Sequence, residues 1–400
     1  MKLISVDTES ALPDIPQPAV GEQWVLVRFR GAPVGILTFA GRGCSSTELA
    51  CTIAERFGEQ MMRRQYREQA FDAPPSAAIT LPRITVAVCS RDGAARLPEC
   101  LDSLESLTYP ADRLERLVID NAPADDSTQR LLRRYPSVRY VVEPAPGLDH
   151  ARNRAIQESS SDVIAFTDDD VSVDPQWVLA LGTLFASDAS ADAATGLVVA
   201  DEIDVESQRL FEVYGGFGRG FDRQYFRVDS VAGEPAARRH GGAGRFGTGA
   251  NMAFRRTVFD RIGTFDPALD VGTQTNGGGD LDMFFRVLKE GGTLVYEPSA
   301  IVRHRHRRTY EALRTQLANN GVGLYAYLVR NAHHYPDERG ALLRLGVWWF
   351  WWWSVRRLAR SFVKPSEFPR DLIVAELLGS VAGLRRYRRA IRAGAAQGSS

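Results

Sequence analysis

The sequence predicts an α/β fold, a mixed and mostly parallel sheet flanked by helices, and three observations predict it. Short apolar runs alternate with segments of helical periodicity between residues 79 and 310. This alternation is typical of parallel strands covered by helices. Polar clusters follow three of the apolar runs, and ligands of such sheets bind at the carboxyl ends of the strands. At 400 residues the chain is long enough for a large core with smaller appendages.

The first region, residues 1–78, predicts a small N-terminal α+β module. Two apolar runs between residues 24 and 39 predict a hairpin across a turn with Gly and Pro. A capping-box pattern at Ser45 and Glu48 predicts the start of a helix. A Pro-rich segment at 72–76 indicates a linker. The module shows no residues typical of catalysis, so we expect a docking or specificity role for it.

The second region, residues 79–310, predicts the main α/β domain. Apolar residues three and four apart between Leu97 and Leu107 predict one face of a helix. The same reasoning predicts strands at 84–89, 117–120, 138–142 and 163–167, and helices at 97–107, 128–135 and 150–159. Because the carboxyl ends of parallel strands meet at one edge, the polar residues after them are expected to lie together. These are Ser90-Arg91-Asp92, Asp120-Asn121 and Asp168-Asp169-Asp170.

The third region, residues 311–400, predicts helices of a different character. Residues 345–353 form an aromatic run with five tryptophans, too short for the about 20 apolar residues that span a bilayer. Arginines follow it, and tryptophan beside arginine is typical of an interfacial membrane helix. We therefore expect contact with a membrane surface through residues 345–360. The alternative is a helix packed on the main domain, with some tryptophans buried there.

Charge and cysteine content exclude several classes of protein. Lysines and arginines number 49 and so do acidic residues, so no overall field favours nucleic acid. The four cysteines show no CxxC spacing, which argues against a zinc site or a disulfide framework. The N-terminus lacks the pattern of a signal peptide. A cytoplasmic location is expected, and the third region in addition predicts contact with the inner face of the cell membrane.

The aspartate triplet 168–170 is the most informative motif. It follows a buried strand, and no basic residue stands beside it. Like charges this close raise one another's pKa when buried, so a cation is expected among them. In an extended chain Asp168 and Asp170 point the same way, and two oxygen donors suit a hard divalent ion that also binds phosphates. The alternative is a solvated acidic turn.

Seven motifs follow one another in the order that a known family shows. They are 90–92, 120–126, 147–153, 168–170, 249–255, 278–282 and 304–306. In this order, and over about 225 residues, the chain resembles family 2 glycosyltransferases with the GT-A fold. The resemblance implies a GT-A-type domain at 79–310, a nucleoside-diphosphate sugar donor, and Mg²⁺ or Mn²⁺ as cofactor.

The resemblance also implies roles for single residues. Asp280 would be the general base. The nucleotide sugar would contact Ser90, Arg91, Asp92, Asp120, Arg152, Asp168 and Asp169. The metal would be held by Asp168, Asp170 and His304. Acceptor-side residues would be Asn251, Gly278, Gly279 and Asp282.

Each role has an alternative. Asp282 competes with Asp280 for the role of the base, and His306 competes with His304 for that of the metal ligand. Asp280 could instead cap a helix, as Asp commonly does. Asp120 could cap the loop after its strand, and Arg152 could pair with a surface acid.

The chemistry of sugar transfer agrees with these roles. A divalent ion neutralises the leaving diphosphate, and one carboxylate takes the proton of the acceptor hydroxyl. A single such base implies direct displacement with inversion, because a covalent route needs a nucleophilic carboxylate as well. Asp280 opens a predicted helix, whose N-terminus favours its ionised form.

Two departures from the family pattern bear on the acceptor. The family usually has Glu before the base, and Gly279 stands there, which puts acceptor orientation in doubt. Gln316 is not followed by the Arg-Trp of processive members. A single addition is therefore expected, in cell-envelope or exported glycan synthesis, onto a glycan or lipid-linked acceptor. UDP, GDP and dTDP donors are all compatible.

Two further functions compete with this prediction. A non-catalytic nucleotide-sugar or glycan-binding protein of the same fold would need no base, yet Asp280 is present. A dinucleotide-dependent oxidoreductase should carry G-x-G-x-x-G after the first strand. That strand leads instead into Ser90-Arg91-Asp92-Gly93, which lacks the pattern.

Overall fold

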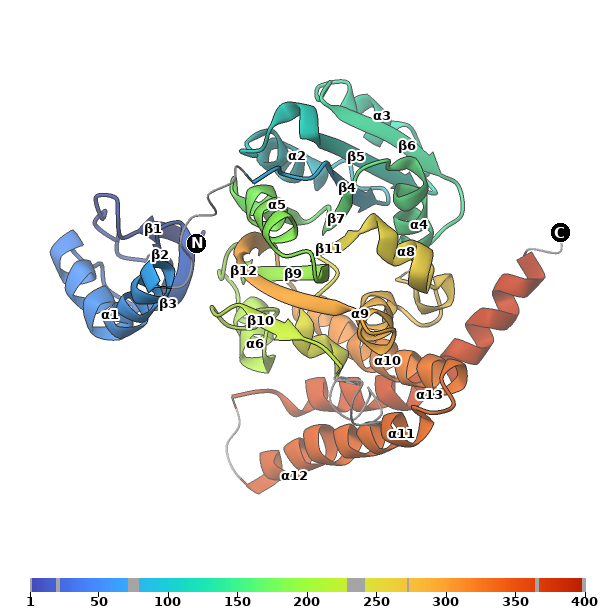
Figure 1. The fold of residues 1–400 in the computed structure, drawn as a ribbon. Coiled ribbons are helices and arrows are strands. Elements are labelled where there is room, and N and C mark those ends of the chain that lie inside the picture. The colour runs from blue at the N-terminus through green and yellow to red at the C-terminus, as the bar shows by residue number, and fades with distance from the viewer. Residues whose placement is uncertain are drawn as a thin grey trace.

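A nine-stranded sheet with helices on its faces forms the centre of the molecule (Figure 1). The computed structural model describes residues 2–18, 22–70, 79–228, 242–271, 273–363 and 367–397. The strand order is β10-β12-β9-β11-β7-β4-β5-β6, and β8 pairs with β12 outside this path.

The four strands predicted from apolar runs form the parallel half of the sheet. They are β4 (Ile84–Ser90), β5 (Leu114–Asn121), β6 (Val138–Glu143) and β7 (Val163–Asp168). All seven residues of β4 are buried, as a strand covered by helices on both faces requires. The connecting helices are α2 (Leu97–Glu105), α3 (Ser127–Leu132) and α4 (Leu148–Glu158). The predicted mostly parallel sheet flanked by helices is confirmed.

The other half of the sheet comes from later residues and includes one inverted central strand. Its strands are β8 (Val171–Val173), β9 (Ala191–Ala200), β10 (Gln224–Phe226), β11 (Asn251–Arg255) and β12 (Thr293–His304). Strand β11 runs antiparallel to both of its neighbours, β7 and β9. Because β11 is inverted, its first residue Asn251 pairs with Thr167 at the end of β7. The chain that leads into β11 thus arrives beside Asp168.

Helices of this second half cover the sheet and carry part of the site. They are α5 (Trp177–Ser187), α6 (Glu206–Tyr214), α8 (Arg256–Ile262) and α9 (Gly279–Lys289). Apolar side chains pack in two large clusters, one on each face of the sheet. The strand ends and the start of α9 are left free of this packing and can face a ligand.

The N-terminal module is a three-stranded sheet with one long helix (Figure 1). Its elements are β1 (Ile4–Asp7), β2 (Glu22–Phe29), β3 (Ala32–Ala40) and α1 (Ser46–Ala70). Val25 and Val27 of β2 pack inside the module, whereas Leu26 packs on Leu197 and Ile301 of the main sheet. This period of two is what a strand between two cores requires. The predicted linker at 72–76 lies outside the described residues.

The C-terminal region is helical, as predicted, and lies along one side of the main domain (Figure 1). It comprises α10 (Tyr310–His334), α11 (Arg339–Trp348), the π-helix η5 (Trp349–Val355), α12 (Arg356–Val363) and α13 (Arg370–Gln397). Tyr325 and Tyr327 of α10 share a core cluster with Phe284 of α9. Within the described part of the chain, no helix combines the length and the apolar character needed to cross a membrane.

Candidate active site

The polar clusters after β4, β5 and β7 meet at one edge of the sheet, as predicted. Ser90 of β4 pairs in register with Asp120 of β5, and Cys89 pairs with Asp168 of β7. The parallel register therefore places residues from three distant segments next to one another.

Asp168, Asp170 and His304 form the candidate metal centre. Their possible ligand atoms all lie within 4.8 Å of one another. His304 ends β12 and pairs in register with Val171, directly after the triplet, so the antiparallel β8–β12 pair brings the histidine to the aspartates. Nε2 of His304 lies 3.5 Å from Oδ1 of Asp170. Two carboxylates and one imidazole are a donor set that suits a divalent ion.

The electrostatics of this cluster favour a bound cation. Burial, and next the neighbouring Asp170, raise the pKa of Asp168 to about 7. Burial lowers the pKa of His304 to about 4, so its imidazole is neutral at neutral pH and keeps a lone pair for a ligand. Neighbouring carboxylates in a buried position repel each other unless a positive charge lies among them. The residues present therefore fit Mg²⁺ or Mn²⁺.

His306 lies behind His304 and is not a member of the ligand group. Its Nδ1 is 3.2 Å from Nδ1 of His304, and its Nε2 is 2.6 Å from Oε1 of Glu212. Because a carboxylate accepts hydrogen bonds, Nε2 of His306 carries a proton and its Nδ1 accepts one from His304. This tautomer leaves Nε2 of His304 free to face the metal site. Glu212, on α6, had no signal in the sequence.

Asp169 is held by the chain itself. It accepts hydrogen bonds from Oγ of Ser90 at 2.6 Å and from Nη2 of Arg96 at 2.7 Å. These contacts fix the loop after β4 to the triplet. The side chain of Arg91 is about half exposed beside this loop. Nucleotide contacts for Ser90, Arg91 and Asp169 stay predictions, and Arg96 is a residue that sequence reasoning missed.

Asp92 and Asp120 lie at the ends of β4 and β5. Asp92 accepts a hydrogen bond from the backbone N–H of Ala124 at 3.0 Å, which shapes the loop after β5. Asp120 is buried, and its Oδ2 accepts from the hydroxyl of Tyr140 at 2.8 Å. Its Oδ1 has no hydrogen-bond partner among the described residues. Burial raises the pKa of Asp120. A buried oxygen without a partner is uncommon and indicates a ligand position.

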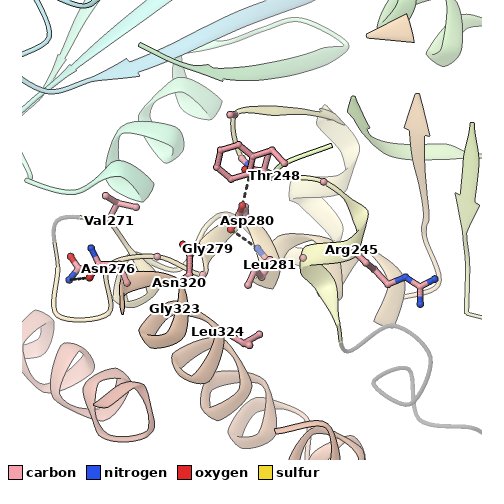
Figure 2. Close-up of a pocket in the computed structure, with 18 of the residues that line it drawn as sticks. Arg245, Thr248, Val271, Asn276, Gly279, Asp280, Leu281, Asn320, Gly323 and Leu324 are labelled. Atoms are coloured by element: carbon pink, nitrogen blue, oxygen red, sulfur yellow. Dashed lines mark hydrogen bonds between the residues drawn. The ribbon is translucent and has the colours of Figure 1, made fainter. Parts of the chain in front are cut away.

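A cavity of about 790 Å³ opens beside the metal centre. Polar residues line one end, namely Asp149, Arg152, Asp168 and Asp280. Apolar and aromatic residues line another part, among them Leu324, Leu345, Trp348, Trp349 and Trp353. Figure 2 shows Asp280 and Leu281 with the α10 residues Asn320, Gly323 and Leu324 around this space. The cavity therefore joins the sheet edge to the C-terminal helices.

Asp280 stands at the start of α9 and faces this cavity (Figure 2). Its Oδ2 accepts a hydrogen bond from the backbone N–H of Gly249 at 2.9 Å, and its Oδ1 from that of Leu281 at 2.9 Å. Two backbone donors hold the carboxylate in place at the start of the helix. The carboxylate is half-buried, so it can act as a base toward a group in the cavity.

Arg152 is buried, which excludes the alternative of a surface pair. Its Nη1 lies 3.0 Å from Oδ1 of Asp149, and its guanidinium lies over the ring of Phe265. A side chain at Gly249 would bring a Cβ within 2.6 Å of Nη2 of Arg152. The glycine thus lets the chain before β11 approach the guanidinium closely.

Two residues expected on the acceptor side lie elsewhere. Asn251 is fully buried: it accepts from Nε1 of Trp177 and donates to the carbonyls of Leu197 and Ala300. Asp282 is also fully buried and pairs with Arg286 at 2.7 Å and Arg330 at 3.0 Å. Neither lines the cavity. Their acceptor-side roles stay predictions, and the buried partners that occupy the oxygens of Asp282 favour Asp280 as the base.

Gly278 and Gly279 line the cavity, and close contacts explain why both are glycines. Gly278 has a φ of 107°, and an added Cβ would lie 2.8 Å from the carbonyl oxygen of Gly323. An added Cβ at Gly279 would lie 2.0 Å from Oδ2 of Asp149. The glycine that replaces the usual Glu therefore stands where a side chain would have to displace the carboxylate of Asp149.

Residues 85–263 match the sequence model of the family described as glycosyl transferase family 2. This part of the chain is similar to family 2 glycosyltransferases. The match begins in β4 and ends after α8, so it contains the aspartate triplet and Arg152. Asp280 and His304 of the glycosyltransferase lie beyond the matched residues, and the fold returns them to the same edge.

Curated relatives of the chain are also glycosyltransferases. Glycosyltransferase AglE of Haloferax volcanii is 26% identical over 242 residues, which are 59% of this chain and 71% of the relative. The glucosyl-dolichyl phosphate glucuronosyltransferase of the same organism is 23% identical over 56% of this chain and 69% of its own. The chain spans a smaller share of other relatives, such as 34% of a probable N-acetylgalactosaminyltransferase of Caenorhabditis elegans.

Among solved structures, the glycosyltransferase resembles the mannosyltransferase PcManGT from Pyrobaculum calidifontis, in complex with GDP-Man and Mn²⁺. The alignment has a TM-score of 0.43 at 19% identity and covers 87% of this chain and 86% of that one.

Proposed function

We propose that the protein is a metal-dependent, inverting glycosyltransferase that moves one sugar from a nucleoside-diphosphate sugar to an acceptor hydroxyl. One observation carries the proposal. Asp280, a half-buried carboxylate, faces the same cavity as Asp168 of the candidate metal centre. A leaving-group site and a base on one cavity are what a direct displacement needs.

The donor would bind along the sheet edge. Asp168, Asp170 and His304 would hold Mn²⁺ or Mg²⁺, which when bound neutralises the diphosphate. The nucleoside would lie toward Asp92 and Asp120, where the unpartnered Oδ1 of Asp120 can accept a hydrogen bond from a hydroxyl of the nucleoside. Arg152 faces the cavity from α4 and adds positive charge beside the diphosphate.

The acceptor would be activated from the other side of the cavity. Asp280 would take the proton of the attacking hydroxyl while Gly249 and Leu281 hold its carboxylate in place. The acceptor oxygen would then displace the nucleoside diphosphate directly at the anomeric carbon, which inverts the configuration there. Residues of α10 and η5 cover the cavity and restrict the entry of water, which competes with the acceptor.

The aromatic part of the cavity supports a lipid-linked acceptor. Trp349 and Trp353 line it from η5, whereas Trp351 and Trp352 are exposed on the same helix. Residues 339–363 hold five arginines and no acidic residue, a charge that suits an anionic membrane surface. We infer that the acceptor is a glycan on a lipid, reached at the inner face of the cell membrane, in envelope or exported glycan synthesis. One of the curated relatives is named for a dolichyl phosphate substrate.

The donor is tested first by thermal shift with UDP-, GDP- and dTDP-sugars, with and without Mn²⁺, because a ligand of the native state raises its stability. Transfer of the matching sugar to alkyl glycosides is then followed for wild type and Asp280→Asn. We expect Asp280→Asn to lower turnover by about 10²–10⁴-fold and to keep Mn²⁺-dependent nucleotide binding. The product should have the opposite anomeric configuration from the donor.

Equal behaviour of wild type and Asp280→Asn would contradict the proposal. If both bind nucleotide sugar and neither transfers it, the non-catalytic binding protein is the better description.

A further inference from the structure

Asp149, which the predicted roles do not include, is a carboxylate with one unused oxygen in the cavity. It lies in the first turn of α4, is 1% exposed and lines the cavity beside Arg152. Its Oδ1 is paired with Nη1 of Arg152 at 3.0 Å. Its Oδ2 has no hydrogen-bond partner among the residues that the structure describes. A buried oxygen of this kind is uncommon unless a ligand or water meets it.

This oxygen lies beside the residue that precedes the base. A Cβ on Gly279 would lie 2.0 Å from Oδ2 of Asp149. The carboxylate from α4 therefore fills the space in which a side chain of residue 279 would begin. It reaches the neighbourhood of Asp280 from a segment about 130 residues earlier in the chain.

The chain holds Asp149 firmly in this position. The backbone N–H of Asp149 donates to Oδ2 of Asp270 at 2.8 Å, which fixes the start of α4. Gly147 allows this contact, since a Cβ there would lie 2.1 Å from the same oxygen. Arg152 fixes the other end of the side chain. A carboxylate held by its own backbone and by a guanidinium is preorganised for a ligand.

A sugar hydroxyl is the group that fits this oxygen. Burial raises the pKa of Asp149, and Arg152 opposes the rise. A hydroxyl can donate to an ionised carboxylate and accept from a protonated one, so it pairs with either form. The diphosphate side is held by the metal centre, whereas Gly279 and Asp280 stand on the acceptor side.

We propose that Asp149 binds a hydroxyl of the acceptor and so replaces the carboxylate that residue 279 cannot carry. The proposal rests on the glycosyltransferase function proposed above. It makes Asp149 a substrate-binding residue that orients the acceptor next to the base, without a part in the proton transfer.

The test uses octyl β-D-glucoside, octyl β-D-galactoside and octyl α-D-mannoside as acceptors, with the donor found by thermal shift. For Asp149→Ala, the KM for the acceptor should rise by roughly 10- to 100-fold, which is the value of a hydrogen bond to a charged group. Its affinity for the nucleotide with Mn²⁺ should change less than the acceptor KM does, because Asp149 reaches the diphosphate side only through its ion pair with Arg152. Asp149→Asn keeps the shape and a hydrogen-bonding amide and should show a smaller rise.

A relocated carboxylate gives the sharper test. Gly279→Glu alone should lose transfer, because its side chain meets Asp149. In the double variant Asp149→Ala with Gly279→Glu, the space is free, and the acceptor KM should fall back by about tenfold or more from that of Asp149→Ala. Melting temperatures identify any variant that does not fold. If Asp149→Ala does not fold, comparison of Asp149→Asn with the double variant still decides the question.

The outcomes separate this inference from the proposed function. If wild type is active and Asp280→Asn is not, but the Asp149 variants keep the wild-type acceptor KM, then the inference is wrong and the function stands. A loss of nucleotide affinity equal to the rise in acceptor KM would also overturn it. If wild type transfers no better than Asp280→Asn, the proposed function fails, and the inference with it.

Discussion

Single carboxylates take different parts in this glycosyltransferase because their surroundings differ. Asp280 and Asp282 are two residues apart on α9. Asp280 accepts from two backbone N–H groups at the cavity, whereas Asp282 is fully buried between Arg286 and Arg330. Residue type and spacing are the same kind of signal for both, so the sequence could only name them as rivals. Their partners differ, and Gly249 and Arg330, which come from other segments, favour Asp280 as the base.

His306 should control metal affinity without binding the metal. His306→Ala removes the side chain that joins Glu212 to His304. Loss of a residue that orients a metal ligand typically weakens metal binding 10–100-fold. Titration calorimetry with Mn²⁺ in the presence of the nucleotide measures the change. His333→Ala, an exposed histidine on α10, is the matched control and should leave the affinity unchanged. An affinity equal to that of wild type in His306→Ala would show that His304 needs no such support.

Asp270 should make the stability depend on pH. Burial raises its pKa from 3.8 to about 6. The folded state then binds this proton more tightly than the unfolded state does. The contribution of Asp270 to the free energy of unfolding is therefore full below about pH 4 and is lost as the pH rises through 6. A shift of about two units corresponds to at most about 3 kcal/mol. Asp270→Asn should remove this part of the slope.

The measurement is the free energy of unfolding in urea at several pH values between 4.5 and 7.5. Asp260→Asn, an exposed aspartate on α8, is the control that should follow wild type. If the difference between wild type and Asp270→Asn is the same at every pH, the raised pKa is not a property of Asp270.

Among the elements, the π-helix η5 divides the tryptophan run between two surroundings. Trp349 and Trp353 line the cavity with ring centres 5.4 Å apart. Trp351 and Trp352 are 61% and 54% exposed, and Arg356 lies over the ring of Trp352. Trp349 and Trp353 thus fit a helix packed on the domain, whereas membrane contact through the exposed Trp351 and Trp352 stays a prediction. A sequence with tryptophan at nearly every position carries no periodicity that could assign the sides.

The exposed tryptophans should anchor the glycosyltransferase to anionic membranes. Each aromatic side chain can bury up to about 200 Å² in the interface, so replacing Trp351 and Trp352 by Gln should weaken binding at least about tenfold. Flotation with vesicles of phosphatidylcholine and phosphatidylglycerol measures it. Met62→Gln with Tyr66→Gln removes exposed apolar side chains of α1 and is the control. Equal flotation of wild type and the tryptophan variant would contradict membrane contact through 345–360.

On the scale of the whole molecule, the N-terminal module contacts the main domain through β2 and through the residues before β1. Leu26 of β2 packs on the sheet, and Arg28 forms a buried ion pair with Asp174, just before α5. The backbone N–H of Leu3 also donates to the carbonyl of Asp201 at 2.9 Å. The predicted docking role of the module stays a prediction, but its alternating strand gives it a physical basis.

The Arg28–Asp174 pair should hold the module in place. Arg28→Ala leaves Asp174 buried without its partner, a change that typically costs about 3–5 kcal/mol. Arg30→Ala removes an exposed pair with Glu9 and a guanidinium contact over the ring of Phe29, and it should cost less than about 1 kcal/mol. Urea unfolding of both variants compares the two. Similar losses would mean that the buried pair contributes no more than a surface one.

The sequence by itself determined the parallel half of the sheet and the residues that gather at its edge. Continuous apolar runs alternating with helical periodicity predict β4 to β7. If these strands are parallel, their carboxyl ends must meet at one edge of the sheet. The aspartate triplet, Asp280 and His304 could be named because their residue types and the order of their motifs can be read directly from the sequence. Strand β11, with only five residues, was missed as an inverted strand, since pairing direction depends on neighbours far away in the sequence.

Only the tertiary structure decided which of the named residues share the site. In the folded chain, Asn251 and Asp282 are buried in the core. Glu212 contacts His306, and the carboxylate of Asp149 lies against Gly279. These outcomes depend on contacts between segments that lie roughly 50 to 130 residues apart in the chain. A local sequence pattern identifies which chemical groups are present. The protonation, burial and contacts of each group depend on the neighbours that the tertiary structure places around it.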